Sequence, residues 1–391
     1  MMTTSIAPVE QKQRAVIVDT LRGFALVGVL VANFSSYTSQ QVPRDILNSI
    51  SSPFDLALIR INSVFIEWKF MTLFSVLFGY GFGLLLMSVE KKNINPNTFF
   101  ARRMFWLFIL GFIHASFWWF DVLHFYAISG LLLLAFRKAG NRTILICSLF
   151  FTFIVPFCFS YVTRNQPDTF TDADFRQAYE NFKHGDFITL VKTNWTGNYK
   201  MFILSAGDIY DIIETLGRFL FGYFLLRIKL FESVQSKAKL FRNIFLITLP
   251  LVAAYFVVVW RATAGKINID SVYLEPLVKI GIFSTTCFYS CIIVLSFISL
   301  GQNRIFKALQ ALGKMTLTNY LLISAVNIIV LYGIGFGQLG EIPMHIIWLC
   351  GLAWLIIEIA VSLLWLSHFR YGPAEWIWRQ LTYGKRLPLK K

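Results

Sequence analysis

Three polar side chains interrupt an apolar run near the start of the chain. The run extends from Ala15 to Tyr37 and contains Asp19, Arg22 and Asn33. Eleven positions separate Arg22 from Asn33, which in a helix is about three turns and about 16 Å of rise, so both project from one face together with Asp19. A charge in a membrane-spanning helix persists where it faces a protein interior or a wet cavity. The pattern therefore predicts a polar functional site inside a helix bundle.

The composition predicts that lipid surrounds this bundle. Hydrophobic residues make up 56% of the 391 residues, 40 of them Phe, and the mean hydropathy is +0.61. A soluble protein of this size has too little interior to bury that much apolar surface. We predict an all-α polytopic membrane helix bundle of about ten transmembrane helices, each long enough to cross the hydrocarbon layer, at residues 15–37, 69–89, 104–120, 121–137, 143–162, 206–228, 240–260, 277–300, 312–336 and 343–367.

Loop charges predict the orientation of the bundle. With the amino terminus in the cytoplasm, the basic loops at 90–103, 137–142, 227–242 and 304–314 and the basic tail all fall on the cytoplasmic side, as the positive-inside bias requires. Both termini are then cytoplasmic, and the first span is an uncleaved anchor of a multi-pass protein in a bacterial inner membrane. The net charge of +15 thus reflects topology and anionic lipid and indicates no nucleic-acid partner.

We predict one integral-membrane domain over residues 1–391. Five amino-terminal spans occupy 15–162, an extracytoplasmic loop occupies 163–205, five carboxyl-terminal spans occupy 206–367, and a cytoplasmic amphipathic tail occupies 368–391. The stretch 54–68 is expected to form an interfacial helix on the outer face, and the long loop to cap the outer mouth of a cavity. In the tail, Gly372 and Pro373 are a helix-start signal.

The third predicted span and the turn after it supply a candidate acid–base group. His114 lies near mid-membrane, where a neutral imidazole can act as a general base. Asp121 and His124 follow at the next hairpin, three positions apart, and a carboxylate that orients an imidazole is the usual partner of such a base. The alternatives are a histidine that only holds helices together and an exposed interfacial pair.

Further polar groups lie within later spans, and we consider them candidate cavity-lining residues. One face of the sixth span carries three acids and a cation: Asp208, Asp211, Glu214 and Arg218. The ninth span carries the amide of Asn319, and the tenth carries the carboxylate of Glu358. The alternative is internal pairing, with Glu214 bonded to Arg218 at i+4 and the amide bonded between helices. The five cysteines have no metal-ligand spacing, so no metal is expected.

Five segments, in order, resemble the YeiB family of bacterial inner-membrane proteins. They are DTLRGFALVGVLVAN at 19–33, KFMTLFSVLFGYGFG at 69–83, His114 followed by Asp121 and Tyr126, GKMTLTNYLL at 313–322 and FRYGPAEWIWRQLTYG at 369–384. Through its first span this family is similar to heparan-alpha-glucosaminide N-acetyltransferase and the acyltransferase type 3 proteins, which share an arginine and, after ten residues, a polar residue. Asn33 resembles the acetyltransferase form. That enzyme has a histidine soon after its asparagine, whereas residues 34–68 here contain none.

The resemblance implies a membrane acyltransferase that uses a cytosolic acyl-CoA-type donor as co-substrate and a small-molecule, glycan or lipid acceptor with a hydroxyl or amine. In this scheme His114 removes the acceptor proton, and Asn33 donates a hydrogen bond to the oxyanion. Arg22 either anchors the donor phosphate or fixes the helix of Asn33 through Asp19, and Asp121 is the further catalytic candidate, as a carboxylate that orients an imidazole. The alternatives are a transporter or lipid-handling protein that uses the same cavity, and a non-catalytic scaffold. Membrane lipid is the remaining expected partner, and the sequence leaves the oligomeric state open.

Overall fold

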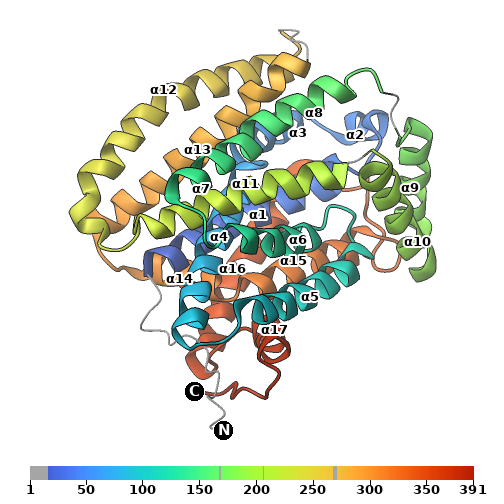
Figure 1. Cartoon of the computed structure of the whole chain (residues 1–391). Helices are drawn as coiled ribbons and strands as arrows, with labels where there is room; N and C mark the ends of the chain where they lie inside the picture. Colours follow the sequence, from blue (N-terminus) through green and yellow to red (C-terminus); the bar gives the residue numbers. More distant parts are fainter. Residues whose placement is uncertain (1–15, 167–168, 206, 267–270) are drawn as a thin grey trace.

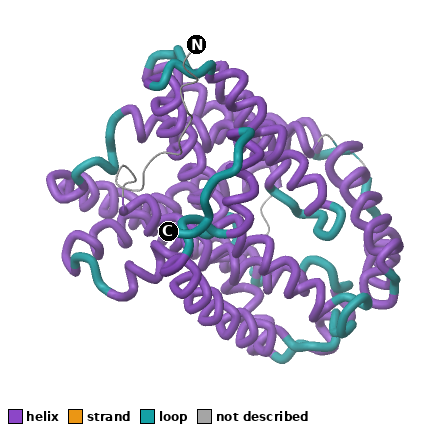
Figure 2. Tube along the Cα trace, turned by 90° about the horizontal axis from the view of Figure 1, so that it is seen from below, coloured by secondary structure: helices purple, strands orange, loops and turns teal. Residues whose placement is uncertain are grey.

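The computed structural model describes residues 16–166, 169–205, 207–266 and 271–391, and every named element in these ranges is a helix (Figures 1 and 2). Sixteen helices follow α1 (Val16–Ser39): α2 (Arg44–Ile50), α3 (Pro53–Ile61), α4 (Lys69–Lys91), α5 (Pro96–Ala115), α6 (Leu123–Leu133), α7 (Asn141–Leu149), α8 (Val155–Thr163), α9 (Asp172–His184), α10 (Phe187–Asn198), α11 (Gly207–Arg227), α12 (Ala238–Thr263), α13 (Ser271–Leu300), α14 (Arg304–Lys314), α15 (Thr316–Leu331), α16 (Met344–His368) and α17 (Pro373–Tyr383). The all-α prediction is confirmed.

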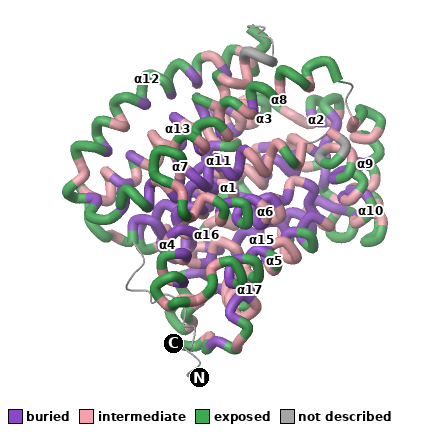
Figure 3. The backbone as a smooth tube through the Cα atoms, in the orientation of Figure 1, coloured by how far each residue is buried: buried purple, intermediate pink, exposed green. Residues whose placement is uncertain are grey.

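Helices α1, α4 and α11 form the centre of the bundle, and α12 lies at its periphery (Figures 1 and 3). Leu21, Ala25 and Leu30 of α1 are completely buried. Glycines allow the backbones to touch, since a Cβ atom on Gly222 of α11 would lie 1.8 Å from the Val76 carbonyl oxygen of α4. By contrast, α12 exposes leucine and isoleucine side chains, as expected of a helix that faces lipid.

The predicted count of ten spans is not confirmed. Within the described residues, seven helices are long and apolar enough to cross a membrane, and there are eight if α14 and α15 form one broken span. These two helices meet at 81°, so the span predicted at 312–336 contains a break near its start, and its unbroken helical part is α15. The run predicted at 121–137 forms a short apolar helix and a final 3₁₀ turn, and α11 carries four charged residues in its last 18, more than an ordinary span tolerates.

The segments outside the long apolar helices are themselves helical. The predicted loop 163–205 contains α9 and α10, each begun by a side-chain cap from Thr171 or Asp186. The stretch predicted as an interfacial helix at 54–68 forms α3 and a π-helical turn at Asn62–Ile66, which leads toward α4. The predicted tail helix is α17, and Gly372 is its N-cap.

Candidate functional site

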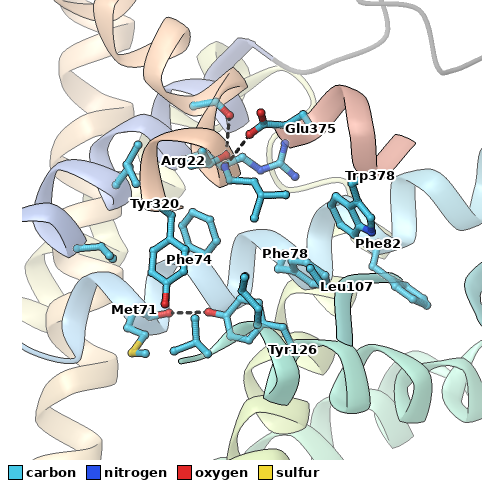
Figure 4. A pocket seen from close by; sticks show the side chains of 18 of the residues that line it. Arg22, Met71, Phe74, Phe78, Phe82, Leu107, Tyr126, Tyr320, Glu375 and Trp378 are labelled. Atoms are coloured by element: carbon cyan, nitrogen blue, oxygen red, sulfur yellow. Dashed lines mark hydrogen bonds between the residues drawn. The ribbon is translucent and has the colours of Figure 1, made fainter. Parts of the chain in front are cut away.

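A cavity of about 710 Å³ lies between α1, α4, α5, α15 and α17. Arg22 and Asn33 both line it, so the two polar residues that the sequence placed on one face of α1 do face a common interior. In Figure 4, Arg22 and Glu375 lie toward one end, Met71 and Tyr126 lie toward the other, and aromatic rings, including that of Phe78, lie between them. The cavity is thus polar at its ends and mainly apolar between them.

Basic side chains dominate the end near the start of α1. Arg22 is joined there by a set of lining cations from four other segments: Lys91, Lys92, Arg103, Lys314 and Arg379. The Arg22 guanidinium donates a hydrogen bond to the Asp19 carboxylate at 3.4 Å and a second one to the Leu77 carbonyl oxygen at 3.4 Å. Asp19 and Glu375 are the acids among the lining residues of this end. The excess of cations suits a polyanionic ligand.

The carboxyl-terminal helix α17 closes this end of the cavity. Glu375 accepts hydrogen bonds from the backbone N–H groups of Leu317 at 2.6 Å and Thr318 at 3.2 Å, the first turn of α15. A carboxylate at a helix amino terminus satisfies donors that have no partner within the helix. Nearby, the Arg103 guanidinium lies 3.6 Å from the ring centre of Trp378. The sequence indicated the helix but gave no signal that it forms part of the cavity wall.

At the other end, Asn33 lines the cavity with a hydrogen-bond donor that is free. Its Nδ2 atom is buried and, among the described residues, has no hydrogen-bond partner. Gln40 and Glu67 line the cavity beyond Asn33, joined by a hydrogen bond of 2.7 Å. Trp68, next to Glu67, has a φ of +66°, a conformation that bulky residues rarely adopt. A buried donor without a partner is costly and often marks a functional site.

His114, Asp121 and His124 form one hydrogen-bonded group directly behind the cavity wall. His114 Nδ1 lies 2.7 Å from Asp121 Oδ1, and His124 Nδ1 lies 2.8 Å from Asp121 Oδ2. His114 and Asp121 are 6% and 0% exposed, respectively. The described lining of the cavity does not include them, but it includes Tyr320, whose ring centre is 5.1 Å from that of His114. The expected pairing of Asp121 with His124 exists, and the same carboxylate also orients His114.

Seven other candidate lining residues are absent from the described lining of this cavity: His124, Asp208, Asp211, Glu214, Arg218, Asn319 and Glu358. On α11, Glu214 pairs with Arg218, and Lys279 of α13 lies 3.0 Å from Glu214, so the internal-pairing interpretation holds for these groups. Asp208 and Asp211 belong to the same stripe. Two more groups bond within or between helices: Asn319 Nδ2 donates to Ser362 Oγ at 3.1 Å, and Glu358 accepts from Trp354 Nε1 at 2.8 Å.

Ser324 is the site residue that sequence reasoning missed. Its Oγ lies 2.9 Å from His114 Nε2, although 210 positions separate the two residues. A serine in an apolar helix carries no signal of such a contact, because small hydroxyls are common in membrane helices. Within the described residues, no group of three His, Cys, Asp or Glu side chains is arranged to hold a metal ion.

The fold and this interior define the class: a polytopic α-helical membrane protein with a polar site inside its bundle. Residues 225–385 match the model of the family described as "Protein of unknown function (DUF418)". Similar proteins include uncharacterized protein YxaH of Bacillus subtilis, 26% identical over 99% of both chains, and uncharacterized protein YeiB of Escherichia coli, 26% identical over 95% of this chain and 96% of YeiB. These matches support assignment of the chain to the YeiB/DUF418 family, as its motifs predicted.

A third relative, "Uncharacterized 39.9 kDa protein in amylase 3'region" of Bacillus acidopullulyticus, is 27% identical over 98% of this chain and 97% of its own length. No solved structure matches the chain. The relatives thus support the family over nearly the whole chain, and any activity has to be argued from the site.

Proposed function

We propose that this protein is an integral-membrane acyltransferase of the bacterial inner membrane, which moves an acyl group from a cytosolic acyl-CoA-type donor to an acceptor hydroxyl or amine inside the bundle. The observation that carries the proposal is that Arg22 and Asn33 line one cavity, with a cluster of cations around Arg22. A polyphosphate donor binds at such a basic end through charge-assisted hydrogen bonds. The predicted orientation puts this end in the cytoplasm, where the donor is available.

The distance along α1 supports this arrangement. Arg22 and Asn33 are separated by about 16 Å of helical rise, which is comparable to the length of an extended phosphopantetheine arm. With the phosphates at Arg22, the thioester carbonyl lies at Asn33. The unpaired Nδ2 of Asn33 then donates a hydrogen bond to the oxyanion that develops on this carbonyl. His114, oriented by Asp121, provides the base from behind the wall.

The transporter interpretation loses its main support. It required the α11 stripe and Glu358 to provide a path through the cavity, and these groups lie outside its described lining. In place of an open path, Glu214 is engaged by Arg218 and Lys279. Buried ion pairs of this kind persist as internal struts, because removal of one partner leaves an uncompensated charge.

Donor binding by purified full-length protein tests the proposal. Arg22→Leu is expected to weaken the binding of acyl-CoA, measured by calorimetry in detergent, by about tenfold or more, since tenfold is about 1.4 kcal/mol and charge-assisted bonds reach that size. Arg137→Leu is the matched control, because Arg137 bonds to Asn97 at 2.8 Å and is absent from the described lining of the cavity. Equal affinity of the Arg22 variant and wild type, together with no thiol release from acyl-CoA by wild type, contradicts the proposal.

A further inference from the structure

Ser324, His114 and Asp121 form a continuous chain of hydrogen bonds that the proposed function does not fully use. Ser324 Oγ lies 2.9 Å from His114 Nε2, and His114 Nδ1 lies 2.7 Å from Asp121 Oδ1. A nucleophile within reach of a base that is itself oriented by a carboxylate is the arrangement of covalent acyl-transfer enzymes. We infer that Ser324 is the nucleophile that carries the acyl group between donor and acceptor. The inference rests on the proposed function and adds a covalent intermediate to it.

The hydrogen bonds fix the direction in which the proton moves. Asp121 is an acceptor on both oxygens when ionised, and it accepts from His114 and His124. The proton of His114 is therefore on Nδ1, which leaves Nε2 free to accept the Ser324 hydroxyl proton at 2.9 Å, a shorter contact than the 3.4 Å from Ser324 Oγ to the Tyr320 carbonyl oxygen. Since both ring nitrogens are engaged, His114 reaches a substrate through Ser324 rather than by direct contact.

We assign the oxyanion to two side chains of α1 with buried donor atoms, Asn33 and Tyr37. Asn33 and Tyr37 are one helical turn apart, and in the described structure neither Asn33 Nδ2 nor the Tyr37 hydroxyl makes a hydrogen bond of good geometry. The Tyr37 hydroxyl lies beside Ser324, and its ring stacks on Trp118 at 3.7 Å between ring centres. A side-chain amide and a phenol hydroxyl are donors of the kind that a tetrahedral intermediate requires.

Access to Ser324 passes one layer of aromatic side chains. Ser324 is 2% exposed, and Tyr320, one turn earlier on α15, lines the cavity together with Trp118. Acylation of Ser324 requires the Tyr320 side chain to rotate, so that the cavity reaches the hydroxyl of Ser324. The cover also keeps water away from an ester on Ser324, and this protects the acyl group until the acceptor arrives.

The two half-reactions balance. In the first, Ser324 Oγ attacks the thioester carbonyl, its proton moves to His114 Nε2, and the C–S bond breaks as the thiolate leaves with that proton as a free thiol. In the second, the acceptor hydroxyl or amine attacks the Ser324 ester and gives its proton to Nε2. The bond from the acyl carbon to Oγ breaks, and Ser324 recovers the proton. Asp121 stays ionised throughout and stabilises the imidazolium.

A fluorophosphonate probe tests the nucleophile without any acyl donor. In full-length protein in detergent, we expect one adduct, located on Ser324 by peptide mass spectrometry, and none in Ser324→Ala. His114→Ala should label about 100-fold more slowly, since a general base contributes at least that factor. Ser362→Ala is the matched control, because Ser362 is an equally buried helix serine bonded to Asn319, and it should label as wild type. No adduct on Ser324 in wild type overturns the inference.

A second measurement separates the inference from the proposed function. Protein mixed with acyl-CoA and quenched in acid is expected to show a mass increase of one acyl group in wild type and none in Ser324→Ala, whose thiol release falls at least 100-fold. Thiol release by Ser324→Ala at the wild-type rate overturns the role of Ser324 and leaves the acyltransferase proposal in place. No thiol release by wild type contradicts the acyltransferase proposal, while probe labelling still decides whether Ser324 is activated.

Discussion

The imidazole of His114 and the carboxylate of Asp121 are joined by a 2.7 Å hydrogen bond across the turn between α5 and α6. Asp121→Asn keeps the shape of this contact but lets the amide dictate the wrong tautomer of the histidine. We expect the thiol-release rate to fall about 100-fold or more while acyl-CoA affinity stays near that of wild type. Asp45→Asn, which removes an exposed ion pair with Arg176, serves as the control. Full activity of Asp121→Asn would exclude the proposed role of His114.

Gly81 offers a way to displace Arg22 without removing its charge. A Cβ atom at position 81 would lie 2.2 Å from Arg22 Nη2, the mobile end of a long side chain, so the guanidinium is pushed aside and the fold is kept. We expect Gly81→Ala to weaken acyl-CoA binding severalfold at unchanged expression, as measured by calorimetry. Gly140→Ala meets nothing within 4 Å and should bind as wild type. Unchanged affinity of Gly81→Ala would show that the donor does not depend on the position of Arg22.

The close contact between α11 and α4 predicts a strict requirement for a small residue. A Cβ atom at Gly222 would lie 1.8 Å from a backbone oxygen, and a backbone cannot move away as a side chain can. Gly222→Ala should lower the melting temperature and the yield of folded protein, because overpacking costs about 1–3 kcal/mol and sometimes more. Gly140→Ala is again the control. Wild-type stability of Gly222→Ala would mean that the two helices pack less closely than described.

The orientation of the bundle is tested by labelling single cysteines in intact cells, in a variant whose five native cysteines are replaced. Cysteines at positions 92, 237 and 385 should be protected from an impermeant thiol reagent, and one at position 172 should react, because the basic loops are expected to stay in the cytoplasm. Permeabilised cells provide the control in which all four react. Labelling at position 237 from outside would reverse the predicted orientation of α11 and α12.

The segment containing α9 and α10 should lose stability in acid. The Lys200 ammonium, 2.7 Å from Asp174, holds the pKa of that carboxyl at about 2, below its unfolded value of about 3.9. A carboxyl whose pKa is lower in the folded state stabilises the fold at pH values above its pKa in the unfolded state. This stabilisation is lost as the pH falls through its pKa in the folded state. The protection of residues 172–198 from hydrogen exchange, taken relative to the intrinsic exchange rate at each pH, should therefore be constant from about pH 7 to 5 and fall between about pH 4 and 2. Lys200→Met should reduce this dependence, and an identical profile would contradict the pairing.

Periodicity was enough to predict the polar face of α1, because Asp19, Arg22 and Asn33 lie within one helix whose geometry is known in advance. The contact between Ser324 and His114 was beyond reach, since it joins α15 to α5 and depends on how the two helices are rotated against each other. The break between α14 and α15 was missed for a similar reason. The apolar run continues through Met315, whereas the chain bends there, next to the close approach of Gly313 to the Asp19 carbonyl of α1.

The sequence also overestimated how many polar groups share the cavity. The charges on α11 have the spacing expected of a lining face, but Lys279 from α13 approaches them from the side and holds Glu214. A cation on another helix leaves no trace in the periodicity of α11. Glu358 differs, because Trp354 on its own helix binds one carboxylate oxygen, while the other, Oε2, is buried without a hydrogen-bond partner among the described residues.

Glu375 and Trp378 complete the basic end of the cavity, so this end is finished late in the synthesis of the chain. Every long apolar helix leaves the ribosome before residues 373–383 do. A nascent chain can therefore insert all the long apolar helices of the described residues while the basic end of the cavity is still unfinished. If the basic end binds the acyl donor as proposed, the donor site is complete only after translation has passed Tyr383, and a chain that stops short of this point is expected to lose donor binding.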